Sequence, residues 1–267
     1  MKISVLMPIY EKEKKEYFEQ AIKSIFIQTL KPDEVVIVED GKITASLENT
    51  IEKYEKKYPK LIKRVKIKNK SNLGKALAIG VENCKNEYIA RMDADDVCLE
   101  TRFEEQTKIL ENNPNLDLLG GYIDEYNEDM TEKISTRKVP IKLEDIKKSI
   151  KWQCPFNHST IISKKSTMLK VGNYKDIPME DYELWARMLA NNCSMMNCDK
   201  VLVKYRTSTQ MYKRRSGIKR IKDTYNIEKF LLSYKIISKT QFYFNIVIRS
   251  IYAILPVKIK KSYYKYF

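Results

Sequence analysis

The chain contains, at residues 88–96, the stretch Tyr88-Ile89-Ala90-Arg91-Met92-Asp93-Ala94-Asp95-Asp96. Its first five residues have the length and composition of a short buried strand, and three carboxylates follow closely. Three earlier runs of the same kind lie at 3–7, 34–38 and 62–67. Segments with apolar residues at helical spacing lie between and after these runs, at 17–28, 47–58, 75–82 and 102–111.

Strands that alternate with helices in this way predict βαβ units and a parallel sheet, so the expected fold class is α/β. Open α/β sheets bind their ligands at the edge where the carboxyl ends of the strands meet. We therefore expect Tyr10, Glu11, Asp40 and the aspartates after Met92 to lie close together. Beyond residue 115 the pattern is less regular, with strands expected at 116–122, 135–139, 159–162 and 201–205 and helices at 143–150 and 179–189.

The aspartate cluster has two interpretations. In an extended chain Asp93 and Asp95 point the same way and can face one ligand. Carboxylates this close repel one another unless a cation lies among them, and hard oxygen ligands suit Mg²⁺ or Mn²⁺. The alternative is that Asp95 or Asp96 caps the helix that follows. The position after a fourth alternating strand favours a ligand site.

The net charge is concentrated near the C-terminal end. The 267 residues include 50 Lys and Arg against 35 Asp and Glu, a net charge of +15. Residues 204–267 hold 16 basic and two acidic residues, whereas residues 1–203 are almost balanced. The chain is therefore a balanced body with a basic tail, and the partners of the two parts are considered separately.

Several protein classes are not expected. The apolar start stops at Pro8, too early for a secretory signal. The longest apolar region, 242–257, is interrupted by polar residues and falls short of the roughly 20 apolar residues that span a bilayer. The five cysteines are odd in number and form no CxxC pair, which indicates reduced thiols in the cytoplasm rather than disulfides or a zinc site.

Seven motifs, in order, resemble the family 2 glycosyltransferases of GT-A fold. They are Val5-Leu6-Met7-Pro8-Ile9-Tyr10, Pro32-Asp33-Glu34-Val35-Val36-Ile37-Val38-Glu39-Asp40-Gly41, Asn72-Leu73-Gly74-Lys75-Ala76-Leu77, Ala90-Arg91-Met92-Asp93-Ala94-Asp95-Asp96, Asn157-His158-Ser159-Thr160, Glu180-Asp181-Tyr182-Glu183-Leu184-Trp185 and Met211-Tyr212-Lys213-Arg214-Arg215. Each motif alone is weak, but their order is specific, and the resemblance covers about residues 1–215. It is strongest to the bacterial branch that builds O-antigen, capsule and exopolysaccharide repeat units. Ser159 departs from the proline that this family usually has after the histidine.

The resemblance implies a Rossmann-like, GT-A type nucleotide-binding sheet merged with an acceptor-binding half and followed by a basic helical tail. The expected parts are a nucleotide-sugar-binding half at 1–115, an acceptor-binding half with the catalytic base at 116–215, and an amphipathic, membrane-associating tail at 216–267. The implied reaction is inverting transfer of a sugar from a nucleotide sugar, expected to be a UDP-sugar. The expected acceptor is a saccharide on a polyprenyl diphosphate carrier.

Three alternatives remain for the function. The acceptor could be a protein or a teichoic-acid-like polymer instead of a lipid-linked saccharide. A metal-dependent nucleotidyltransferase also uses carboxylate-bound metal on an α/β sheet, but residues 7–15 lack the glycine-rich phosphate loop such enzymes usually have. A non-catalytic nucleotide-sugar-binding protein would keep the aspartates after the strands but would not need Asp181.

The resemblance assigns a donor site to residues after the first, second and fourth strands. Pro8, Tyr10, Glu11 and Asp40 would hold the nucleoside, although Asp40 before Gly41 also fits a simple turn. Gly74 would allow a close backbone approach, and Lys75 and Arg91 would reach the diphosphate. Asp93 would contact the ribose.

The resemblance also assigns the metal and the base. Asp95 would bind Mn²⁺ or Mg²⁺, which acts as a Lewis acid on the diphosphate leaving group. His158, the only histidine, is a second candidate at the metal, the diphosphate or the acceptor. Asp181 matches the base that takes the proton from the acceptor hydroxyl, since a carboxylate at a helix start stays ionised. The alternative is that Glu180 or Asp181 only begins the helix.

The basic residues beyond 204 suggest two kinds of partner, a diphosphate and an anionic membrane surface. Arg206, Arg214 and Arg215, together with Glu180, are expected at the diphosphate of the donor or of the acceptor. Nucleic acid is not expected, because no RNA-binding sheet pattern, helix-turn-helix or zinc signature is present.

The expected helices at 218–237 and 242–255 are basic and amphipathic, with one apolar face on the first made by Ile218, Ile221, Tyr225, Leu232 and Ile236. Such helices lie on anionic membrane surfaces. The expected location is therefore the cytoplasm, peripherally at the inner face of the cell membrane. The alternative is a helical lid packed on the core.

Overall fold

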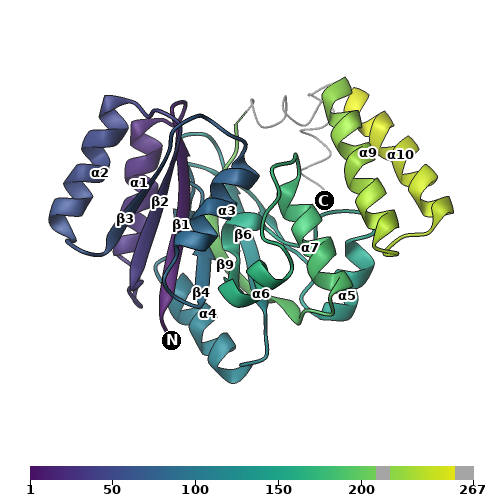
Figure 1. Cartoon of the computed structure of the whole chain (residues 1–267), viewed down its shortest axis with the longest axis horizontal. Coiled ribbons are helices and arrows are strands. Elements are labelled where there is room, and N and C mark those ends of the chain that lie inside the picture. Colours follow the sequence, from purple (N-terminus) through teal and green to yellow (C-terminus); the bar gives the residue numbers. More distant parts are fainter. Residues whose placement is uncertain (209–216, 256–267) are drawn as a thin grey trace.

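The computed structural model describes residues 1–208 and 217–255. This part of the chain forms one nine-stranded sheet in the order β3-β2-β1-β4-β8-β6-β9-β5, with β7 paired to β6 (Figure 1). The strands are β1 (Ile3–Tyr10), β2 (Glu34–Asp40), β3 (Ile62–Ile67), β4 (Tyr88–Arg91), β5 (Val97–Cys98), β6 (Leu118–Tyr126), β7 (Lys133–Arg137), β8 (Ile162–Lys164) and β9 (Met195–Arg206). The α-helices are α1 (Lys15–Phe26), α2 (Ala45–Lys57), α3 (Leu73–Asn83), α4 (Arg102–Asn112), α5 (Leu143–Ser149), α6 (Lys165–Lys170), α7 (Glu180–Ala190), α9 (Ile218–Ser233) and α10 (Lys239–Ile254).

The first four strands form a part of the sheet in which all pairs are parallel. β1 pairs in parallel with β2 and with β4, and β2 pairs in parallel with β3. Helices cover both faces of this part, so its inner strands are buried on both sides and are almost continuously apolar. The predicted α/β fold with a parallel sheet is confirmed.

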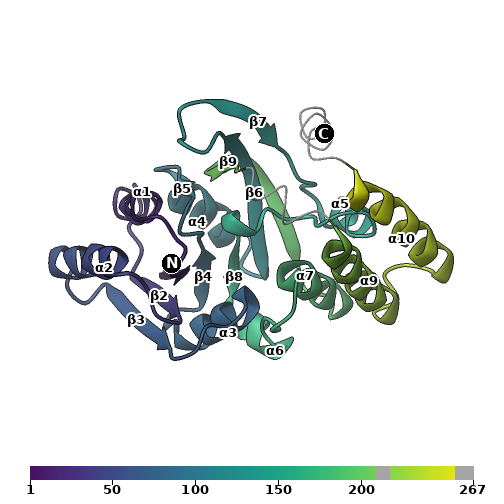
Figure 2. The ribbon, with the colours of Figure 1, turned by 90° about the horizontal axis from the view of Figure 1, so that it is seen from above.

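Alternate residues of β1 contribute to two separate cores. Val5 and Met7 pack on one face with α1, α2 and α4, whereas Leu6 packs on the other face with α3, α6 and α7. Figure 2 shows α1 and α2 on one side of the sheet and α3 and α6 on the other. This sandwich fixes the carboxyl ends of β1, β2 and β4 at one edge.

The sheet continues without a break into the second part of the chain. β4 pairs antiparallel with β8, β8 with β6, and β6 pairs in parallel with the long strand β9. The expected strand at 159–162 is wrong, because His158–Thr160 form a 3₁₀ turn and β8 begins at Ile162. The Thr160 hydroxyl donates to the Asn157 carbonyl (2.7 Å), a local bond that replaces strand pairing there.

Helices α9 and α10 pack side by side at the end of the molecule opposite α1 and α2 (Figure 1, Figure 2). The buried residues of α9 are Thr224, Ile227, Glu228 and Leu231, so this helix packs on the core with a face other than the apolar one identified in the sequence. Ile218 and Tyr225, placed on that face, are exposed. Nothing in residues 1–208 or 217–255 forms a helix with the length and hydropathy needed to cross a bilayer.

Candidate active site

A large cleft opens where the carboxyl ends of the parallel strands face the second part of the sheet. Its volume is about 1560 Å³, and its walls come from β1, β2, the segment after β4, the start of α7, the end of β9 and helices α9 and α10. Of the residues selected from the sequence, those that line it are Pro8, Tyr10, Asp40, Arg91, Asp93, Asp95, His158, Asp181 and Arg206. The expectation that strand-end residues meet at one edge is confirmed for Tyr10, Asp40 and the aspartates.

The aspartates after β4 form a tight group. One carboxylate oxygen from each of Asp93, Asp95 and Asp96 lies within 4.8 Å of the others. Burial and the neighbouring carboxylates raise the pKa of Asp95 to about 6 and that of Asp96 well above its ordinary value. Asp96 Oδ2 is buried and has no hydrogen-bond partner. Three carboxylates this close together, one of them with a free buried oxygen, fit a divalent cation, which prefers such hard ligands.

Two charged residues extend this group. The Arg91 guanidinium is buried and pairs with Asp93, while its Nε has no partner. Glu13, in the loop after β1, lines the cleft, and burial together with Asp95 and Asp93 raises its pKa to about 7. Sequence reasoning selected Glu11 instead, but Glu11 lies outside the cleft and pairs with Lys70 (3.2 Å). The position of Glu13 in the loop after the first strand is the signal that could have identified it.

Asp40 organises the loop that covers the end of β2. Its Oδ1 accepts hydrogen bonds from the Ser71 backbone N–H (2.7 Å) and hydroxyl (2.8 Å). The Lys70 ammonium lies 5.0 Å from the centre of the Tyr10 ring. Asp40 therefore has a structural contact, while its side chain still borders the cleft.

Gly74 and Lys75 do not line the cleft. A Cβ on Gly74 would lie 1.9 Å from the Lys175 carbonyl oxygen, so the missing side chain lets the loop before α7 approach α3. Lys75 is exposed on α3. The close approach predicted at Gly74 is present, but it is made by the protein backbone.

Asp181 and Glu180 begin α7 and occupy different environments. Asp181 lines the cleft and accepts a hydrogen bond from the Cys154 thiol (3.7 Å). Glu180 is buried outside the lining, and burial together with Asp181 raises its pKa to about 8. Met179, just before the helix, has a left-handed backbone (φ 59°), which is uncommon for a residue with a side chain. The sharp entry to α7 turns Asp181 toward the cleft.

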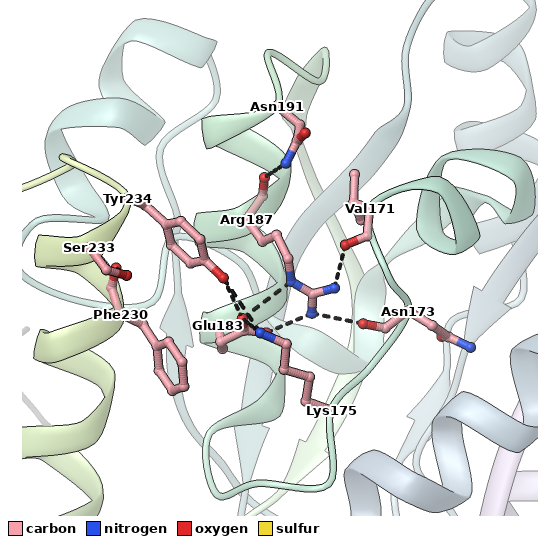
Figure 3. Close-up of polar contacts among 9 residues, drawn as sticks. All are labelled: Val171, Asn173, Lys175, Glu183, Arg187, Asn191, Phe230, Ser233 and Tyr234. Atoms are coloured by element: carbon pink, nitrogen blue, oxygen red, sulfur yellow. Dashed lines mark hydrogen bonds and ion pairs between the residues drawn. The ribbon is translucent and has the colours of Figure 1, made fainter.

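A buried ion network holds α7 in place (Figure 3). Glu183, which is inaccessible to solvent, accepts hydrogen bonds from Lys175 (2.6 Å), Arg187 (2.6 Å) and the Tyr234 hydroxyl (3.0 Å). Arg187 also donates to the carbonyls of Val171 and Asn173. The network joins the loop before α7, α7 itself and α9.

The structure does not bring His158 into the carboxylate group. Its Nε2 is hydrogen-bonded to the Tyr174 hydroxyl (2.8 Å), and its ring meets the edge of Trp185 with 5.9 Å between centroids. Burial and the charge of Arg91 lower the pKa of His158 well below its ordinary value. A neutral His158 on the cleft wall fits a position beside the diphosphate or acceptor better than a metal ligand in this arrangement.

Arg206 is committed to protein contacts, although it borders the cleft. Its guanidinium donates to the carbonyls of Asp95 (2.8 Å) and Glu128 and to Gln20 Oε1 (2.7 Å), and it lies 3.8 Å from the centre of the Tyr17 ring. Its backbone N–H donates to Asp96 Oδ1 (2.8 Å). Arg206 therefore fixes the aspartate segment, whereas the sequence predicted a diphosphate contact. Arg214 and Arg215, predicted beside it, lie outside the described residues.

The parallel strands carry a carboxylate cluster at their ends, and the second part of the sheet adds a carboxylate at the start of a helix. This combination is typical of the class of GT-A glycosyltransferases. A solved structure has the same fold. The chain superposes on a crystal structure of S. aureus TarS, residues 1–349, with a TM-score of 0.67 and 18% identity over 93% of this chain and 71% of that one. The predicted GT-A fold is confirmed.

Residues 4–176 match the family model described as "Glycosyl transferase family 2", and the chain belongs to that family. It is 33% identical to the amylovoran biosynthesis glycosyltransferase AmsE of Erwinia amylovora, over 98% of this chain and 97% of the relative. It is 34% identical to the UDP-Gal:alpha-D-GlcNAc-diphosphoundecaprenol beta-1,3-galactosyltransferase of Escherichia coli, over 99% of this chain and 95% of that protein. The predicted family is confirmed, and its members similar to this chain include enzymes named for exopolysaccharide synthesis.

Proposed function

We propose that this glycosyltransferase moves a sugar, with inversion, from a UDP-sugar to a saccharide linked to a lipid diphosphate, in the synthesis of a bacterial surface polysaccharide. One observation carries the proposal: the carboxylate group after β4 and the carboxylate of Asp181 border the same cleft. Carboxylates that would hold a metal ion for the leaving diphosphate, and a separate base for the acceptor, meet the two requirements of this reaction.

The donor would lie across the ends of β1, β2 and β4. Tyr10 and Asp40 would contact the nucleoside, Asp93 the ribose, and Arg91 the diphosphate, to which a guanidinium offers a planar pair of donors. Asp95 would hold Mg²⁺ or Mn²⁺ in the carboxylate group described above. Such an ion, when bound, supplies Lewis-acid stabilisation of the diphosphate as it leaves.

Asp181 would act as the base. Its carboxylate takes the proton of an acceptor hydroxyl, the oxygen of that hydroxyl bonds to the anomeric carbon, and the bond from this carbon to the diphosphate breaks with its electron pair on the diphosphate. Glu180 supports this role because its raised pKa keeps it protonated at neutral pH, so that it adds no second negative charge. Asp181 also lies in the first turn of α7, where the helix dipole attracts negative charge.

The donor and acceptor classes are supported by the relatives. The E. coli relative, similar over nearly the whole chain, is named for UDP-Gal and for a diphosphoundecaprenol-linked GlcNAc. We expect the same classes of donor and acceptor here. The reaction would then take place at the cytoplasmic face of the membrane, where a lipid-linked acceptor lies within reach.

The test is a screen of the purified full chain against UDP-, GDP- and dTDP-sugars, with Mn²⁺, Mg²⁺ or a chelator, and with a lipid diphosphate saccharide dissolved in detergent. We expect metal-dependent transfer from a UDP-sugar. In Asp181→Asn, transfer should fall by about 10³-fold, within the range of a lost general base, while UDP binding measured by calorimetry is retained.

Asp145→Asn is the matched control, because Asp145 also lies in the first turn of a helix but is exposed and outside the cleft. Its transfer rate should equal that of the unchanged chain. Normal turnover by Asp181→Asn would remove the base assignment. Transfer to a protein or to a polyol phosphate polymer, with none to the lipid diphosphate, would contradict the proposed acceptor.

A further inference from the structure

From Gln241 onward, helix α10 presents an apolar face to solvent. Every exposed residue between Gln241 and Leu255 is apolar. These residues are Tyr243, Phe244, Val247, Ile248, Ile251 and Ile254, and their exposed fractions lie between 50% and 72%. At 100° per residue their positions cover an arc of about 140° of the helix surface. Apolar faces of this extent mark contact surfaces more often than ordinary solvent-facing helix.

Buried polar contacts fix the rotation of α10 and so keep this face outward. Asn245 donates to Glu228 of α9 (2.9 Å) and to the Lys151 carbonyl (2.9 Å). Arg249 forms an ion pair with Glu228 (3.1 Å) and donates to the Trp152 carbonyl (2.7 Å). Because Glu228 is buried, turning the helix would leave its charge without a partner.

The apolar face reaches the rim of the cleft. Trp152 is exposed and meets Phe244 edge to face with 6.0 Å between the ring centroids. Trp152, Ile248 and Tyr252 also line the cleft. Whatever covers α10 therefore lies beside the entrance to the proposed active site.

The segment that carries the face is positively charged. Residues 217–255 include seven basic and two acidic residues. The acidic Glu228 is buried and paired with Arg249. Five lysines of this segment are exposed, namely Lys219, Lys222, Lys229, Lys235 and Lys239. A second copy of the chain docked face to face would bring two such surfaces together. An anionic surface that accepts apolar side chains is complementary to both features.

We propose that the α10 face, made of Tyr243, Phe244, Val247, Ile248, Ile251 and Ile254 with Trp152 at its border, docks on an anionic lipid bilayer and turns the cleft rim toward the membrane. Aliphatic side chains enter the boundary between headgroups and acyl chains, and Trp152 and Tyr243 lie at the headgroup level, which amphipathic rings prefer. The docking itself is independent of the reaction. The direction of acceptor entry rests on the proposed function, since only a lipid-linked acceptor would arrive from the membrane.

The experiment is flotation of the full chain with two kinds of vesicle, one containing phosphatidylglycerol and phosphatidylethanolamine, the other only phosphatidylcholine. The unchanged chain should float with the anionic vesicles. Val247→Glu/Ile251→Glu changes two exposed residues that do not line the cleft, so folding should be retained. Its partition into anionic vesicles should fall by about 100-fold, because burying each such apolar side chain is worth roughly a factor of ten.

Ile27→Glu is the control, since Ile27 is an exposed isoleucine directly after α1. Helix α1 lies far from α10 (Figure 1). Its flotation should match that of the unchanged chain. Transfer to an acceptor in detergent separates the two proposals: the double variant should keep this activity and lose transfer to an acceptor embedded in vesicles. Absence of detergent activity in the unchanged chain would contradict the proposed function without affecting the flotation result.

Three results would overturn the docking proposal. The first is equal flotation of the double variant and the unchanged chain. The second is no flotation of the unchanged chain, expected if its own residues 256–267 cover the face. The third is a dimer of the unchanged chain that the double variant converts to a monomer, which would show that a second copy covers the face.

Discussion

At the scale of single residues, Arg206 shows how the second part of the sheet shapes the aspartate group. It ends β9, and its side chain and backbone reach Asp95 and Asp96, which are more than a hundred residues earlier in the chain. A positive charge at this position also offsets the repulsion among the carboxylates. Arg206 therefore acts on the proposed metal site through the residues that form it, as a positioning residue.

Replacing Arg206 with methionine tests this role. Methionine keeps an unbranched stem over Tyr17 but cannot donate to Asp95, Glu128 or Gln20. We expect the metal concentration for half-maximal transfer to rise about 10- to 100-fold, the usual effect of removing a residue that orients metal ligands. Titration of Mn²⁺ in the transfer assay measures this change.

Arg64→Met is the control for general loss of stability. Arg64 forms a partly buried ion pair with Glu39 (2.6 Å) at the opposite end of the sheet. This variant should lower the melting temperature without changing the metal requirement. An unchanged metal requirement in Arg206→Met would contradict the positioning role and would favour a direct contact with a diphosphate.

At the scale of elements, α7 depends on a buried carboxylate for its position. Burial raises the pKa of Glu183, but hydrogen bonds from Arg187 and Lys175 outweigh this effect and hold the pKa below its ordinary value. The Lys175 backbone meets Gly74 of α3 on its other side. The helix that carries Asp181 is therefore tied to both α3 and α9.

Glu183→Gln should lower the free energy of unfolding by about 3–5 kcal/mol, because it leaves Arg187 and Lys175 without their buried counter-charge. Because the pKa of Glu183 is lower in the folded chain than in the unfolded chain, the ionised carboxylate stabilises the fold at pH values above the unfolded-state pKa, near 4.3. This stability is lost as the pH falls through the folded-state pKa. The unchanged chain should therefore lose more stability on acidification than Glu183→Gln. Urea unfolding at neutral and acidic pH measures both effects.

Glu144→Gln provides the comparison, since Glu144 forms an exposed pair with Lys147 (2.8 Å) on α5. Exposed pairs of this kind contribute at most about 1 kcal/mol, so its unfolding curve should almost coincide with that of the unchanged chain. Equal destabilisation by the two variants would mean that the Glu183 network does not hold α7.

The sequence predicted best the bounds of those elements that a local pattern specifies. β3 was predicted with its observed bounds, and α4 within one residue, because period and turn residues alone specify them. The inward face of α9 could not be predicted in this way, since Glu228 is buried only because Arg249 of the next helix pairs with it. The short helix α6 was missed for the same kind of reason: one buried residue, Met168, gives no periodic signal.

The candidate site follows the same rule. Asp40, Asp93 and Asp95 were predictable because residues just past parallel strands must meet at one edge. The contacts of Gly74 and Arg206 depend on partners roughly a hundred residues away, and no local pattern indicates them. Glu13 acquires its raised pKa only from the burial and the carboxylates that the fold brings to it.

At the scale of the whole molecule, charge and apolar surface are both displaced toward one end. Residues 217–255 hold seven basic and two acidic residues, and the helices that they form, α9 and α10, lie opposite α1 and α2 (Figure 1). The same end carries the apolar face of α10 and one wall of the cleft. The excess of five positive charges in residues 217–255 therefore lies on helices beside the cleft entrance, and it says little about the reaction inside.

Salt separates the two contributions to the proposed docking. Screening shortens from about 10 Å at 0.1 M salt to about 3 Å at 1 M, so exposed lysines lose most of their attraction to anionic lipid. We expect flotation with phosphatidylglycerol vesicles to weaken about tenfold or more, since each Lys or Arg near such a surface contributes about 1 kcal/mol. The apolar contribution should persist, because salt does not weaken the burial of apolar surface. At high salt the unchanged chain should therefore still float more than Val247→Glu/Ile251→Glu. If the two float equally there, attraction of the lysines alone accounts for binding, and the α10 face takes no part in it.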